Sequence, residues 1–112
     1  MTPEQFKNIK KETKMIKSET NYYIVRCTGA GVYLAKIDEM RGDTADLADA
    51  RLIHYYTGAT ATIGIALNGL GPDSRITLPV EKMTVLRVCA VIPVTEKALA
   101  SILAVKPWSI EP

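Results

Sequence analysis

The sequence predicts an α+β domain that is mostly β: a small antiparallel meander or sandwich of about six short strands, with N- and C-terminal helices and one short inserted helix. Two observations predict this class. Runs rich in β-branched and aromatic residues alternate with turn residues, and helical spacing of apolar residues marks the ends of the chain. The 112 residues, 47% of them hydrophobic, suit one ordinary domain. We expect a lysine-rich helical segment over residues 1–20 and a single β-rich domain over 21–112.

The first expected element is a polar helix over residues 4–19. Thr2 can cap it, Pro3 suits its first turn, and Glu4 favours the positive end of the helix dipole. Its thin apolar stripe consists of Phe6, Ile9, Met15 and Ile16. Such a helix would dock weakly or pack against a neighbouring subunit.

Four short antiparallel strands are expected next, arranged as a meander. The first two surround a connection at residues 29–31 (Gly-Ala-Gly), which indicates a hairpin. Residues 41–43 (Arg-Gly-Asp) predict the next turn, and a bend near Asp49 separates the last two strands. The expected strands cover residues 22–28, 32–37, 44–48 and 51–56.

Residues 59–67 fit two kinds of structure. Their apolar side chains fall on one helical face, but three of them also alternate as in a strand. We favour a short helix, because Thr57 or Thr60 can cap it and the Asn-Gly pair at 68–69 can end it.

The rest of the chain predicts two strands and a helix. A turn at 71–74 leads to an edge strand over 75–80. Residues 84–94 are nearly continuous in β-branched and apolar side chains and predict the strongest strand. Thr95 can cap a final helix over 96–105, which has a broad apolar face.

Charge and hydropathy argue against several classes of protein. The net charge of +2 comes from residues 1–20, and the other residues carry as many basic as acidic side chains. A domain that grips duplex nucleic acid through its phosphates normally has a basic excess, so duplex DNA or RNA is not an expected partner. No apolar run is long enough to cross a membrane, and the first residues do not resemble a signal peptide, so we expect a cytoplasmic protein.

The two cysteines and the single histidine argue against a metal centre. Cys27 and Cys89 lie 62 positions apart in two predicted strands, and with one histidine they do not supply the four ligands of a zinc site. We expect two buried free thiols without a disulfide, no metal and no cofactor. The sequence has no nucleophile motif or phosphate loop, so no residue is assigned a catalytic role.

The strand expected at 51–56 mixes aromatic and polar residues and is the strongest candidate for a binding site. Tyrosine can stack on a planar group, arginine can neutralise a phosphate, and free backbone N–H groups can bind oxygen. The predicted ligand-binding residues are Arg26, Tyr33, Arg51, His54, Tyr55, Tyr56, Thr57 and Gly58. The alternative is that the tyrosines only border the core and that Arg51 pairs with Asp46 or Asp49.

Four segments carry a family resemblance. They are Arg26-Cys27-x-x-Ala30-Gly31-Val32, Ala50-Arg51-x-Ile53-x-Tyr55-Tyr56-x-Gly58-Ala59, Ile92-Pro93-Val94-Thr95-Glu96-Lys97-Ala98 and Pro107-Trp108. With them the chain resembles, over about residues 21–108, a family of small uncharacterised proteins encoded by bacteriophages and prophages. The resemblance implies a viral origin but no activity. Small phage proteins of this kind include inhibitors of host defence, some of which sequester nucleotide signals in pockets between subunits.

Three functions are open at this point. The first is a homo-oligomeric, non-catalytic protein of the host cytoplasm that holds a small nucleotide-like anion and so inhibits host defence. The second is a protein- or nucleic-acid-interaction module without a small ligand, which docks through residues 4–19. The third is a small nucleotide hydrolase or phosphodiesterase that uses His54 with Asp46 or Asp49. We prefer the first, because no catalytic set is evident and oligomerisation would supplement a modest core.

Overall fold

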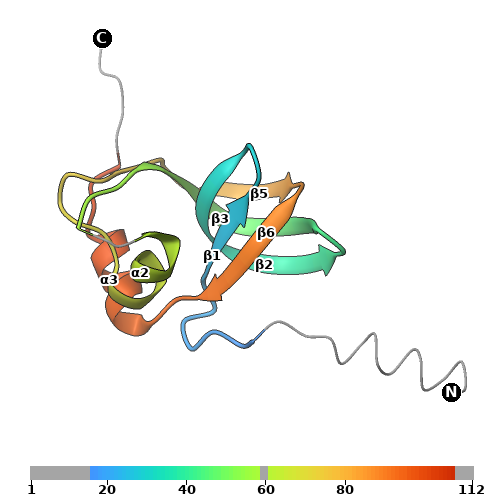
Figure 1. Ribbon diagram of the computed structural model, residues 1–112, viewed down its shortest axis with the longest axis horizontal. Helices are drawn as coiled ribbons and strands as arrows, with labels where there is room; N and C mark the ends of the chain where they lie inside the picture. The colour runs from blue at the N-terminus through green and yellow to red at the C-terminus, as the bar shows by residue number, and fades with distance from the viewer. Residues whose placement is uncertain (1–15, 59–60, 108–112) are drawn as a thin grey trace, which may run out of the picture.

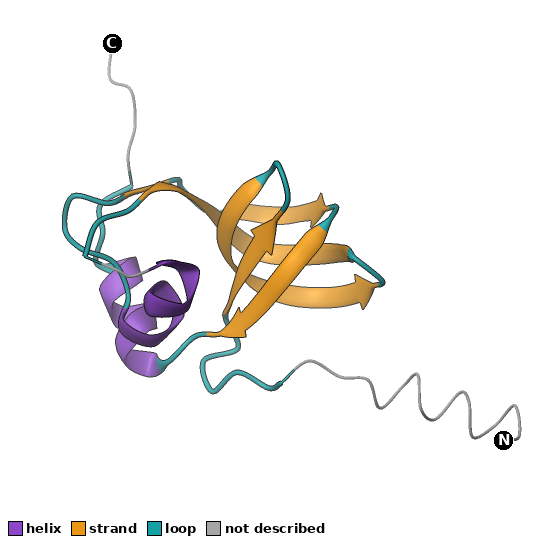
Figure 2. Cartoon of the chain, viewed as in Figure 1, coloured by secondary structure: helices purple, strands orange, loops and turns teal. Residues whose placement is uncertain are grey.

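The computed structural model of the protein describes residues 16–58 and 61–107. In chain order its elements are β1 (Tyr23–Cys27), β2 (Gly31–Arg41), β3 (Thr44–Tyr55), α2 (Ala61–Asn68), β4 (Arg75–Ile76), β5 (Val80–Val85), β6 (Val88–Pro93) and α3 (Glu96–Leu103). The strands form one antiparallel sheet in the order β4-β3-β2-β1-β6, and β5 pairs with the first half of β3. The sheet curls, and α2 and α3 lie side by side at one end of it (Figures 1 and 2). The expected mostly β class is confirmed.

Strand β3 replaces two of the expected strands. Separate strands at 44–48 and 51–56 were predicted, but β3 is continuous, pairing first with β5 and then with β4. The bend lies inside the strand, where Asp49 has a φ of 51° and the register with β2 shifts. A bulge of this kind turns a strand while the ladder continues on both sides. The predicted meander of four short strands is therefore wrong in this detail.

The strand predicted at 84–94 is also divided. It forms the end of β5 and all of β6, because Arg87 has a φ of 58° and the chain reverses after Val85. Residues 85–88 contain no Gly, Pro, Asn or Asp, so the sequence carries no turn signal there. The edge strand expected at 75–80 is shorter, since β4 has only two residues.

Both described helices agree with the sequence. Residues 61–68 form α2 rather than a strand, and Thr95 caps α3. The Thr95 hydroxyl accepts a hydrogen bond from the Ala98 N–H at 3.1 Å and donates one to the Leu67 carbonyl at 2.9 Å. One side chain therefore caps α3 and ties it to the end of α2.

The expected N-terminal helix lies mostly outside the described residues. Its last part, residues 16–19, is described and is not helical, so the predicted boundary is wrong. The Ser18 hydroxyl is buried there and donates to the Val94 carbonyl at 3.3 Å. This bond fastens the chain to the junction between β6 and α3.

Two hydrophobic clusters fill the two faces of the sheet. The outer face packs against the helices, and its cluster includes Ile24, Leu34, Ile53, Ile65, Ala66, Ala98 and Ile102. The inner face lies inside the curl, and its cluster includes Val25, Cys27, Ala35, Leu47 and Val85. Cys27 is buried as expected, but Cys89 is exposed, so that prediction is wrong for Cys89.

Candidate functional site

A group of polar side chains lies on the outer face of the sheet, beside the part that the helices cover. Strand pairing places Ile24, Leu34 and Arg51 side by side on this face. One step along, Tyr22 and Lys36 lie on the same face, because side chains on a strand alternate between the two faces. Asp49 reaches this group through the bulge in β3, and we call Tyr22, Lys36, Asp49 and Arg51 the Tyr22 cluster.

The members of the Tyr22 cluster interact with one another. The Tyr22 hydroxyl donates a short hydrogen bond to the Asp49 carboxylate. The Lys36 Nζ lies 5.3 Å from the centroid of the Tyr22 ring, within the range of a cation–π contact. Arg51 is close enough to Tyr22 for its charge to act on the phenol. The cluster therefore combines two cations, one carboxylate and an aromatic ring.

Arg51 is the member with the clearest capacity for a ligand. It is half-buried, next to the fully buried Leu34. Within residues 16–58 and 61–107, no carboxylate lies at ion-pair distance from its guanidinium; Asp49 instead accepts from Tyr22, and Asp46 accepts from Arg41. The pairing of Arg51 with Asp46 or Asp49, predicted as an alternative, is not formed. The guanidinium is permanently charged and carries several N–H donors in one plane, so in this position it can bind an oxyanion.

A hollow of about 360 Å³ opens beside the cluster. It is lined by Lys36, Ala48, Asp49, Pro79, Glu81 and Lys82. Cationic and carboxylate groups both line it, so a ligand there could place an anion near Lys36 and hydrogen-bond donors near the carboxylates. The volume falls in the range of small-molecule sites.

The environment of Tyr22 changes its acidity. Burial, the hydrogen bond to Asp49 and the charge of Asp49 together raise the pKa of the phenol to about 12, although the charge of Arg51 partly opposes them. The folded state therefore holds the Tyr22 proton more tightly than the unfolded chain, whose tyrosine pKa is about 10. The resulting stabilisation is fully present below about pH 10 and is lost as the pH rises toward 12.

Replacing Tyr22 tests this arrangement. In an alkaline titration followed by tyrosinate absorbance, the folded wild-type protein should show a step near pH 12 that is missing in Tyr22→Phe. The matched control is Tyr33→Phe, because Tyr33 donates to the Ala30 carbonyl on the exposed surface and should leave that step in place. Identical titration curves for wild type and Tyr22→Phe, with circular dichroism showing an intact fold, would contradict the arrangement.

The predicted site residues at the end of β3 do not join Arg51. Tyr55 is 51% exposed and pairs with Arg75, whose guanidinium carbon lies 5.7 Å from the ring centroid. His54 is also exposed, whereas Tyr56 packs against the outer core. Tyr55 and Arg75 thus form a separate aromatic and cationic pair at the junction of β3 and β4.

Thr57 and Gly58 have structural contacts. The Thr57 N–H donates to Ser74 Oγ at 2.9 Å, and the Thr57 carbonyl accepts from the Gly71 N–H at 2.6 Å. A Cβ on Gly58 would meet the Gly71 backbone at 2.9 Å. These contacts hold the turn before β4 against the end of β3.

The remaining two predicted residues lie on the paired strands β1 and β2 but on opposite faces of the sheet. Arg26 is exposed on β1, paired with Val32 and Ala90. Tyr33 packs on the inner cluster, and its hydroxyl donates to the Ala30 carbonyl at 3.1 Å. Of the eight predicted residues, only Arg51 belongs to the Tyr22 cluster. Tyr22, Lys36 and Asp49 were not among these eight ligand-binding residues, because strand register and the bulge, which a local motif does not reveal, place them there.

The geometry gives no support to an acid–base pair involving His54. His54 is eight positions from Asp46 on the same strand, which corresponds to roughly 26 Å of extended chain. Asp49 is nearer along the strand, but its carboxylate already accepts from Tyr22. Among the described residues there is also no group of three or more His, Cys, Asp or Glu side chains arranged to hold a metal ion.

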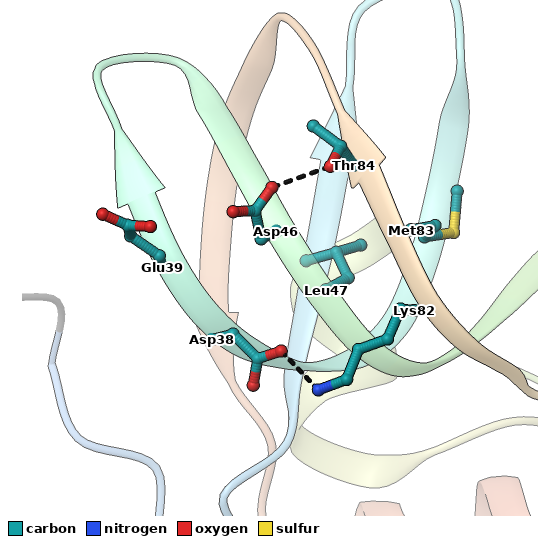
Figure 3. Close-up of a pocket in the computed structure, with 7 residues that line it drawn as sticks. All are labelled: Asp38, Glu39, Asp46, Leu47, Lys82, Met83 and Thr84. Atoms are coloured by element: carbon teal, nitrogen blue, oxygen red, sulfur yellow. Dashed lines mark hydrogen bonds and ion pairs between the residues drawn. The ribbon is translucent and has the colours of Figure 1, made fainter.

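A second hollow, of about 600 Å³, lies between β2, β3 and β5 (Figure 3). It is lined by Asp38, Glu39, Asp46, Leu47, Lys82, Met83 and Thr84. Its polar groups bind one another, since Lys82 contacts Asp38 at 2.7 Å and Thr84 donates to Asp46 at 2.7 Å. Arg41 also contacts Asp46, and these bonds lower the pKa of that carboxyl to about 2. This hollow is acidic and internally paired, so it does not suit an anion.

Comparison with known proteins identifies a family. The model of a family described as "Domain of unknown function (DUF6948)" matches residues 20–102. No curated protein and no solved structure matches the chain. Neither described helix is long and apolar enough to cross a membrane.

Proposed function

The chain belongs to the DUF6948 family, a domain of unknown function, and from its surface we propose that it is a non-catalytic protein that binds a small nucleotide-like anion at the Tyr22 cluster. One observation carries this proposal. The half-buried guanidinium of Arg51 lies near Tyr22 and has no carboxylate partner in the described part of the chain. A buried or half-buried charge without a partner favours an oppositely charged ligand.

The mixed charge of the neighbouring hollow supports a nucleotide rather than a simple anion. Phosphate oxygens would accept from Arg51 and Lys36, while amino or hydroxyl groups of the base and sugar would donate to Asp49 or Glu81. The Tyr22 ring, which attracts the Lys36 ammonium, offers an aromatic surface beside them. Each part of a nucleotide thus has a chemically matched group within the cluster and its hollow.

We propose that two or more copies of the chain assemble around the ligand. The hollow is open, so one chain would leave much of a nucleotide in water. Helix α2 is apolar on nearly all sides, and its Ile63 and Leu67 side chains are 62% and 52% exposed. A helix of this kind is normally buried, so this surface supports a contact with another copy.

Holding a nucleotide without converting it is a means of sequestration. We therefore propose, following the resemblance to phage-encoded proteins, that the chain is of viral origin and acts in the host cytoplasm by withdrawing a nucleotide signal of host defence. Because the exposed α2 side chains would equally suit another protein, an interaction module without a small ligand is the second candidate.

Native mass spectrometry of the full chain tests the proposal. AMP, ATP and a cyclic dinucleotide are added separately, with inorganic phosphate as the control. We expect a homo-oligomer that retains at least one of the nucleotides and binds phosphate much more weakly. If none of the three nucleotides is retained, the proposal is contradicted. A monomer without bound nucleotide would favour the interaction module instead.

A further inference from the structure

The fold brings together two cysteines that are far apart in the sequence. Cys27 ends β1, Cys89 is the second residue of β6, and these two strands pair. The register pairs Arg26 with Ala90 and Cys27 with Val88, so Cys89 is the extra residue of a bulge. A bulged residue is left unpaired in the ladder, and a bulge re-aims the side chain that it carries.

The thiol of Cys89 lies over the neighbouring strand. It donates to the Arg26 carbonyl oxygen at 3.4 Å, and this carbonyl belongs to the peptide bond that Arg26 shares with Cys27. The two side chains differ in access, since Cys27 is 4% exposed and Cys89 is exposed. The Cys89 thiol is therefore accessible to a reagent, whereas the Cys27 thiol on the paired strand is buried.

We propose that Cys27 and Cys89 are a redox-active pair that closes into an intramolecular disulfide by exchange with a low-molecular-weight disulfide such as oxidised glutathione. Neighbouring positions on paired strands bring the Cα atoms into the range that a disulfide spans. The bulge at Cys89 supplies the freedom needed to turn its side chain toward Cys27.

The exchange takes place in two balanced steps. The Cys89 thiol gives up its proton to solvent, and its thiolate attacks one sulfur of oxidised glutathione, so that a Cys89–glutathione bond forms, the glutathione disulfide breaks, and one glutathione thiolate leaves. Cys27 then loses its proton to solvent, and its sulfur attacks the Cys89 sulfur and expels the second glutathione thiolate. Both leaving thiolates take up protons. Two protein thiols have been oxidised, and one glutathione disulfide has been reduced to two thiols.

The environment assigns the two thiols different roles. Burial raises the pKa of the Cys27 thiol, and the nearby Cys89 sulfur raises it further. The exposed Cys89 therefore reacts first with the glutathione disulfide, and Cys27 reacts more slowly, as the thiol that resolves the mixed disulfide. The closed disulfide would cross-link β6, the last strand in the sheet order, to β1, with which it pairs.

Treatment of the full chain with oxidised glutathione tests the pair. Under denaturing, non-reducing conditions we expect a chain lighter by two hydrogens, with no disulfide to a second chain and with one peptide pair linked through Cys27 and Cys89. Its melting temperature should exceed that of the reduced protein, because the cross-link restricts the unfolded chain, and dithiothreitol should reverse both changes. Cys27→Ala should stop at a glutathione adduct on Cys89, and Cys89→Ser should remain unmodified.

Two results would overturn the inference. One is a wild-type protein that keeps glutathione on Cys89 while Cys27 stays reduced, even after long incubation. The other is oxidation that links only Cys89 of one chain to Cys89 of another. Both variants are compared with wild type by circular dichroism, and Cys89→Ser, at an exposed position, keeps the test valid if Cys27→Ala does not fold.

Discussion

Gly69→Ala should lower the free energy of unfolding by about 3 kcal/mol. Gly69 follows α2 with a φ of 89°, and its N–H donates to the Ile65 carbonyl at 2.9 Å. A Cβ there would collide with the Ser101 side chain and lie 3.0 Å from the Ala98 carbonyl oxygen. Ser101 has little freedom to move away, because its hydroxyl accepts from the Leu70 N–H at 3.0 Å. The destabilisation from the backbone strain and the destabilisation from the collision with α3 therefore add.

Gly42→Ala is the matched control for this substitution. Gly42 also has a positive φ, 61°, but a Cβ there would meet nothing within 4 Å. Gly42→Ala should lower the free energy of unfolding only by the strain of the left-handed backbone conformation, about 1 kcal/mol. Urea unfolding followed by circular dichroism compares the two variants. If both variants lost the same free energy of unfolding, the close approach of α2 to α3 at Gly69 would not be a constraint on the fold.

Arg51→Ala should weaken binding of the nucleotide found by native mass spectrometry by about 100-fold, because charge-assisted hydrogen bonds to phosphate contribute roughly 3 kcal/mol. The fold should change little. Arg51 makes no ion pair within the described residues, so its removal should change the free energy of unfolding by less than about 1 kcal/mol. Isothermal titration calorimetry measures the affinity, and urea unfolding measures the stability.

Arg41→Ala provides the control for charge. Arg41 is an exposed arginine held by Glu39 and Asp46 at the far end of β2 and β3, so its loss lowers the net charge equally. It should leave nucleotide affinity within a factor of about 2, since screened surface charges act weakly over distance. The proposal for Arg51 fails if both variants lose affinity alike, or if Arg51→Ala unfolds the protein.

The sequence predicts best those elements that local chemistry determines. Thr95 caps α3 and the Asn-Gly pair at 68–69 ends α2, because capping and left-handed glycine conformations depend on neighbouring residues alone. Asp49 and Arg87 were harder to interpret. Each has a positive φ without being glycine. The bend near Asp49 was predicted, but the continuation of β3 through it was not, and neither was the break at Arg87.

The candidate site was predictable only in part, for a related reason. Arg51 stood out as an arginine in an aromatic strand, but its neighbours Tyr22, Lys36 and Asp49 come from three separate segments. A shift of one residue in register would have placed each of them on the opposite face. The nearness of Cys27 and Cys89 depends on strand pairing in the same way, and so does the role of Thr57 in a turn rather than at a ligand.

Backbone amide NMR of the full chain, titrated with whichever of AMP, ATP or the cyclic dinucleotide native mass spectrometry shows to be retained, tests the binding site most directly. The largest changes in chemical shift should cluster at Tyr22, Lys36, Asp49 and Arg51, with smaller ones at Glu81 and Lys82 beside the hollow. Inorganic phosphate should shift the Arg51 region weakly. Shift changes confined to Tyr55 and Arg75, or no shift change at the Tyr22 cluster under saturating nucleotide, would contradict the proposed binding site.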